Sequence, residues 1–120
     1  NYTTILCVHF FIRNKIIMKN EKGGTTMNVS TCLNILREIK DVAFATVDEN
    51  NQPQVRIIDV MLVEDNKLYF CTARGKDFYK QLKNHPYVAI IGMNKEYQMV
   101  RLNGPVKRLE NQKYPYYNLR

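Results

Sequence analysis

Cysteine and glycine are scarce in this sequence, and it has no long uninterrupted apolar run. The three cysteines (Cys7, Cys32 and Cys71) are far apart and form no C-x-x-C motif, so we expect no zinc site, iron–sulfur cluster or disulfide framework. This pattern favours reduced cysteines in a cytoplasmic protein. Five glycines and no low-complexity tract exclude collagen-like and linker-dominated chains. The apolar stretch 5–17 contains the polar run RNK, which argues against a membrane helix or signal peptide.

Length and charge restrict the fold and the partners further. The chain has 120 residues, of which 45% are hydrophobic and 24% charged, as expected for one folded domain rather than a disordered chain. Lys and Arg exceed Asp and Glu by 18 − 11 = 7, which permits an anionic partner. Residues 1–26 carry 4 − 1 = 3 of these charges, so only 7 − 3 = 4 remain elsewhere. Without interleaved basic and aromatic residues, we expect no nucleic-acid binding.

Residues 1–26 differ in character from the rest of the sequence. They show neither clear helical nor clear strand periodicity, and they end in the run EKGGTT just before Met27. Lys-Gly-Gly shortly before a methionine is what a bacterial ribosome-binding site gives when it is translated. We therefore predict that Met27 is the true start and that residues 1–26 are a non-native or disordered leader. The alternative is an N-terminal arm that packs as an extra helix or strand.

From Met27 onward the periodicity is regular. Cys32, Ile35, Leu36 and Ile39 share one face of a predicted helix. The order that follows is three strands, a short helix and two strands, without the alternation of a parallel α/β sheet. It predicts a mainly β fold with short helices, an antiparallel barrel or curved sheet. The predicted strands are 42–47, 54–63, 68–72, 87–93 and 98–109, with the second helix at 77–84 and a tail without a clear element at 113–120.

One cation stands out on the predicted strand 54–63. Arg56 shares a strand face with Ile58 and Val60, where a lone charge is costly unless an anion meets it. A phosphate would fit, because the planar guanidinium can bind two oxygens. The alternative, which spacing alone favours, is a salt bridge to Asp48, to Asp77 or to a partner subunit.

A second candidate is the segment CTARGKD at residues 71–77. It places the hydroxyl of Thr72, the flexible Gly75 and the cation of Lys76 between a strand and a helix N-terminus. Free N–H groups and the helix dipole favour an anion there. The segment lacks the Walker pattern, and solvated loops often look like it. Together with Arg56 on the preceding hairpin strand it predicts a phosphate-binding site.

These stretches resemble the pyridoxamine 5'-phosphate oxidase-like family of FMN-binding split barrels. The resemblance covers residues 27–112, which we take as one split-barrel domain. Within the family, the sequence is most similar to the short bacterial branch. It is carried by several loose motifs in a specific order, namely VAFATV at 42–47, PQVR at 53–56, KLYFCT at 67–72, Lys76 with Leu82 and Pro86, and RLNG at 101–104.

The resemblance implies a Greek-key barrel, a homodimer, and FMN bound between the subunits. By motif match, Arg56 and Lys76 would bind the FMN phosphate, and Thr72 would hydrogen-bond near it. Ile57 and Ile58 would offer backbone contacts to the isoalloxazine ring. No residue is predicted to act as a catalytic acid or base, and no metal is expected.

Three departures from the family pattern qualify this expectation. Met99 stands where an aromatic residue is often found before the RLNG-type strand. The sequence contains no R-x-H pair of the kind that contacts the vitamin substrate in the oxidase proper, which argues against pyridoxamine phosphate oxidation. The tail 113–120 does not continue the family pattern, so we expect a truncated member whose barrel lacks its last strand.

The resulting prediction is an FMN-binding flavoprotein of the split-barrel type. As an oxidoreductase it would use a small-molecule electron donor or acceptor such as a reduced nicotinamide. The alternative is a non-catalytic module that binds flavin, another phosphorylated ligand or a tetrapyrrole.

Overall fold

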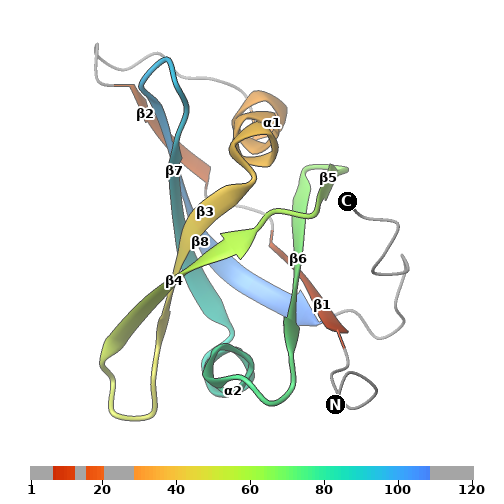
Figure 1. The fold of residues 1–120 in the computed structure, drawn as a ribbon, viewed down its shortest axis with the longest axis vertical. Helices are drawn as coiled ribbons and strands as arrows, with labels where there is room; N and C mark the ends of the chain where they lie inside the picture. Colours follow the sequence, from red (N-terminus) through yellow and green to blue (C-terminus); the bar gives the residue numbers. More distant parts are fainter. Residues whose placement is uncertain (1–6, 13–15, 21–28, 109–120) are drawn as a thin grey trace.

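A computed structural model describes residues 7–12, 16–20 and 29–108 (Figure 1). Two short helices lie at opposite ends of the long axis, with strands between them. The elements in chain order are β1 (Cys7–Ile12), β2 (Ile16–Asn20), α1 (Val29–Ile39), β3 (Asp41–Val47), β4 (Pro53–Asp59), β5 (Leu62–Glu64), β6 (Lys67–Ala73), α2 (Asp77–Asn84), β7 (Tyr87–Met93) and β8 (Gln98–Arg108).

The strands form one sheet in the order β4-β3-β7-β8-β1-β6-β5, with β2 also paired to β8. The pairings in the described part of the chain are antiparallel. The long β8 joins the two halves of the sheet, because one part of it pairs with β7 and β2 and another with β1. The predicted mainly β, antiparallel fold with short helices is therefore confirmed.

The predicted strand 54–63 is wrong as a single element. It is divided into β4 and β5 at Val60 and Met61, which are both buried and therefore break the alternation of the two faces. The N–H of Val60 donates to the carbonyl of Lys40, whereas the N–H of Met61 donates to the carbonyl of Tyr69 on β6. The chain thus changes its partner from β3 to β6 within two residues.

Residues 1–26 contain β1 and β2, although their sequence shows no clear periodicity. β1 pairs with β6 and β8, and β2 pairs with β8. The prediction that Met27 is the native start remains a prediction, and the predicted tail 113–120 lies outside the described residues. Cys71 on β6 is disulfide-bonded, so the expectation of reduced cysteines was wrong at this position, whereas Cys32 is a buried free thiol. The spacing of the cysteines along the sequence did not indicate this disulfide, because the pairing of β6 with the distant β1 cannot be inferred from spacing.

The core lies between α1, α2 and one face of the sheet. Three aromatic rings occupy its centre, with Phe44 packed edge-on against Phe70 at a centroid distance of 4.8 Å and Phe78 of α2 stacked on Phe70 at 5.7 Å. On β3 the buried residues alternate, as a half-buried strand requires. The helix face predicted from the sequence is confirmed for Cys32, Ile35 and Leu36, which are buried in α1, and Ile39 is partly buried against the same core. Leu33, which was not predicted, is buried as well.

α1 packs tightly against the sheet at Gly92 of β7. A Cβ atom at this position would lie 3.0 Å from Val42 Cγ1 and 3.1 Å from both Ile39 Cδ1 and Leu36 Cδ2. We expect Gly92→Ala to lower the free energy of unfolding by about 1–3 kcal/mol, because the added methyl overpacks the contact. Urea unfolding measures this loss. Gly75→Ala is the control, since a Cβ at Gly75 meets no atom within 4 Å, and equal losses in both variants would contradict the packing argument.

In the part of the chain that the structure describes, we find no helix with the length and apolar character needed to cross a membrane.

Candidate anion-binding site

Arg56 is held at the junction of β4, β3 and α2. It lies on the core-facing side of β4, with Phe44 opposite it on β3. Its Nη1 donates to the hydroxyl of Thr46 at 2.7 Å and to the backbone carbonyl of Phe44 at 3.3 Å, and its Nη2 donates to Gln81 Oε1 at 2.7 Å. The Thr46 hydroxyl donates to the same Gln81 oxygen. The guanidinium is therefore fixed by a closed set of hydrogen bonds.

An aromatic platform supports the same guanidinium. The Arg56 Cζ lies 4.5 Å from the centroid of the Phe78 ring, within the range of a cation–π contact. Phe78 is itself stacked on Phe70 in the core. Phe78 and Gln81 are three residues apart on α2, so one face of this helix provides both the ring and the amide that position Arg56.

The acceptors around Arg56 are uncharged. They are a hydroxyl, an amide oxygen and a backbone carbonyl. In the described residues, no carboxylate forms an ion pair with Arg56 within 4 Å. The pKa of Arg56 is lowered by burial, and the negative charge of Asp77 opposes this shift. The predicted salt bridge to Asp48 or Asp77 is therefore not formed at contact distance. A partly buried cation without an adjacent carboxylate is a suitable site for an anion.

Two of the five guanidinium N–H groups remain available. The hydrogen bonds described above use three of the five donors that an arginine carries. In the described part of the chain, the other two have no acceptor. A phosphate has enough oxygens to accept from both.

Thr72 and Lys76 lie on the segment that leads into α2. Thr72, near the end of β6, is only 7% exposed, and its hydroxyl has no hydrogen-bond partner in the described structure. Lys76 is exposed and precedes the first residue of α2, whose N-terminus receives no side-chain cap. A buried hydroxyl without a partner costs free energy unless a ligand or water satisfies it. The convergence of Arg56, Thr72 and Lys76 on one ligand stays a prediction.

Ile57 and Ile58 lie on opposite faces of β4. Ile58 is partly buried and packs against the core, whereas the side chain of Ile57 is 64% exposed. Ile57 belongs to a set of apolar and small residues on the solvent-facing side of β4, β3 and β7, which we name the outer face. Its members are Val55, Ile57, Ala43, Ala45, Tyr87, Ala89, Ile91 and Met93. The predicted backbone contacts of Ile57 and Ile58 to a flavin ring stay a prediction.

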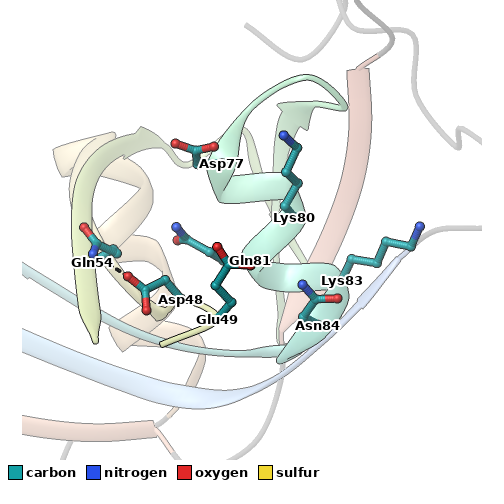
Figure 2. Close-up of a pocket in the computed structure, with 8 residues that line it drawn as sticks. All are labelled: Asp48, Glu49, Gln54, Asp77, Lys80, Gln81, Lys83 and Asn84. Atoms are coloured by element: carbon teal, nitrogen blue, oxygen red, sulfur yellow. Dashed lines mark hydrogen bonds between the residues drawn. The ribbon is translucent and has the colours of Figure 1, made fainter. Parts of the chain in front are cut away.

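A cavity of about 500 Å³ opens beside the site, between the β3–β4 hairpin and α2 (Figure 2). Gln81 and Asp77 line its helix wall, and Asp48 lies on the hairpin wall. Hydrogen bonds from the Gln52 N–H and the Gln54 amide lower the pKa of Asp48. Its carboxylate thus stabilises its own turn rather than neutralising Arg56. The complete lining is Asp48, Glu49, Gln54, Asp77, Lys80, Gln81, Lys83 and Asn84.

Three partners of Arg56 were missed by the sequence analysis. Thr46 lies within VAFATV, and Phe78 and Gln81 lie within the predicted helix 77–84, but none of the three was predicted to contact Arg56. The available signal was the helical spacing of Phe78 and Gln81, which places both on one face. In the described residues, no group of three or more His, Cys, Asp or Glu side chains is placed to hold a metal ion.

Comparison with known proteins gave a family match and a structural match. A family model described as pyridoxamine 5'-phosphate oxidase matches residues 30–119. The crystal structure of a NimC/NimA family protein from Clostridium acetobutylicum is similar, with 35% sequence identity and a TM-score of 0.57. The match covers 64% of this chain and 53% of that chain, so the chain spans about half the length of that protein. No curated protein matched the sequence.

Proposed function

Because the chain belongs to the pyridoxamine 5'-phosphate oxidase family of split barrels, we propose that it binds FMN and acts as an FMN-dependent oxidoreductase. The family and the split-barrel fold predicted from the sequence are confirmed by these matches. The FMN site, the homodimer and the redox activity go beyond these matches, and we propose them here.

The main support for the proposal is the environment of the Arg56 guanidinium. Its guanidinium is partly buried, positioned by Thr46 and Gln81, and without a carboxylate in contact. It also keeps two N–H donors for a ligand. An anion is the group that best compensates such a cation, and the terminal phosphate of FMN is a dianion near neutral pH.

Thr72 and Lys76 complete the proposed phosphate site. The unpartnered hydroxyl of Thr72 would donate to a phosphate oxygen, which removes the cost of leaving it unsatisfied. Lys76 would add a second positive charge at the uncapped N-terminus of α2, where the helix dipole also favours an anion. The residues present therefore fit a phosphate group.

The outer face supports the proposed homodimer. Its large side chains include Val55 (68% exposed), Ile57 (64%) and Met93 (50%), and they are continuous across β4, β3 and β7. Exposed apolar patches of this kind mark interaction surfaces. A second copy of the chain would bury this face, and Ile57 would then place the backbone of β4 beside an isoalloxazine ring held between the subunits.

The bound flavin would supply the electron or hydride transfer, with a small-molecule donor or acceptor such as a reduced nicotinamide. The residues of this chain would hold the phosphate, keep the ring between two subunits and exclude water from it. The cytoplasmic location stays a prediction of the sequence.

Titration of the purified protein with FMN and with riboflavin tests the proposal. We expect a bound flavin with absorption near 450 nm, roughly the value for oxidised flavins. We expect FMN to bind at least about 10-fold more tightly than riboflavin, because riboflavin lacks the phosphate. Equal affinities would contradict the phosphate site. Oxidation of NAD(P)H by the FMN-loaded protein would then distinguish an enzyme from a carrier.

A further inference from the structure

Gln81 is the residue of α2 that contacts Arg56 by hydrogen bonding. Its Oε1 accepts from Arg56 Nη2 at 2.7 Å and also from the hydroxyl of Thr46. Thr46 is buried and itself accepts from Arg56 Nη1, so the three side chains fix one another. Any rotation of the guanidinium would break at least one of these hydrogen bonds.

The uncharged nature of this acceptor is the important property. Arginine usually pairs with a carboxylate, and such a pair is stronger than a pair with an amide. Carboxylates are available nearby, because Asp48, Glu49 and Asp77 line the adjoining cavity. Figure 2 shows Gln81 on the α2 wall of this cavity, facing the hairpin that carries Asp48 and Glu49. The contact position is nevertheless occupied by an amide, which orients the cation without neutralising it.

We propose that Gln81 is the positioning residue of the phosphate site, and that its neutral amide oxygen orients Arg56 while leaving the guanidinium charge for the ligand. This inference rests on the proposed function, since it concerns the same site. It assigns to Gln81 a specificity role, namely the preference for a phosphorylated flavin over an unphosphorylated one.

Gln81→Glu is the decisive variant, because stability and ligand preference should change in opposite directions. The glutamate keeps an oxygen for Arg56 and Thr46 and adds an ion pair, so the melting temperature should stay equal or rise. The same carboxylate neutralises Arg56 and repels phosphate. The preference for FMN over riboflavin should therefore fall about 10-fold or more, with riboflavin affinity unchanged. A purely structural role of Gln81 would not lower this preference in a protein of undiminished stability.

A matched control and a second variant accompany this test. Asn84→Asp makes the same amide-to-carboxylate change on the same helix and beside the same cavity, but Asn84 has no hydrogen bond to Arg56 in the described structure. It should keep the wild-type preference. Should Gln81→Glu fail to fold, Gln81→Leu removes the acceptor without adding charge, and the preference should fall about 3- to 10-fold.

The outcomes separate the two proposals. If the wild type does not prefer FMN over riboflavin, the proposed function and this inference both fail. If the wild type prefers FMN and Arg56→Ala abolishes that preference, but Gln81→Glu and Gln81→Leu retain it, only the role of Gln81 is overturned. An equal loss in Asn84→Asp would also overturn it, because a general charge effect would then explain the result.

Discussion

Replacing Arg56 with alanine is expected to weaken FMN binding about 10- to 150-fold, the equivalent of a lost hydrogen-bonded charge of about 1.5–3 kcal/mol. Riboflavin binding should change little, because Arg56 is proposed to contact only the phosphate. The fold should survive, since Thr46 and Gln81 remain hydrogen-bonded to each other after the guanidinium is removed. Fluorescence titration with both flavins measures the two affinities.

Two further variants make this test specific. Arg56→Lys keeps a positive charge but loses the planar fork and the contacts to two acceptors at once, so an intermediate loss is expected. Arg37→Ala removes a cation from the last turn of α1, away from α2, and should leave FMN affinity unchanged. If Arg56→Ala binds FMN as tightly as the wild type, Arg56 is not part of the phosphate site.

The Val55→Asp, Ile91→Asp double variant is expected to convert a homodimer into monomers. Both residues belong to the outer face. In a two-fold symmetric dimer each substitution occurs once in each subunit, so the interface would bury four new carboxylates without partner charges. The dimer dissociation constant should therefore rise by more than about 100-fold. The monomer should keep its fold, because both side chains are exposed on the single chain. Sedimentation velocity gives the oligomeric state, and loss of FMN binding should accompany dissociation.

Val29→Asp is the matched control for the double variant. Val29 is also an exposed apolar residue, but it lies on α1, which packs through Leu36 and Ile39 against the opposite side of the sheet at Gly92. This variant should remain a dimer. A wild type that sediments as a monomer, or a double variant that stays dimeric, would remove the outer face as the interface.

Local signals account for the parts of the fold that the sequence predicted well. The helical spacing of Cys32, Ile35 and Leu36 identified the buried side of α1, and the β-branched and small residues of 42–47 identified β3. The predicted strands 42–47 and 54–63 left the polar run DENNQ at 48–52 between them, and this run does separate β3 from β4, which begins one residue earlier than predicted, at Pro53. These features depend on neighbours in the sequence, so they can be inferred before any tertiary contact is known.

Contacts between distant segments were not accessible in the same way. Val60 and Met61 were predicted as part of one strand. The chain instead changes its hydrogen-bonding partner there, from Lys40 just before β3 to Tyr69 of β6. β1 was not predicted, because nothing in residues 7–12 indicates pairing with β6 more than fifty residues later. Such pairings are chosen by the complete sheet and not by local propensity.

The sequence by itself determined the fold class and the family. It also identified Arg56 as a cation on an apolar strand face, where a charge is costly unless an anion binds to it. The tertiary structure alone decided how that cation is satisfied. It placed Thr46 of β3 and Gln81 of α2 on the guanidinium, 10 and 25 positions away along the chain, and kept carboxylates out of contact. The reason is that a charge and its strand face are properties of local residues, whereas the acceptors around the charge depend on how α2 packs across the hairpin.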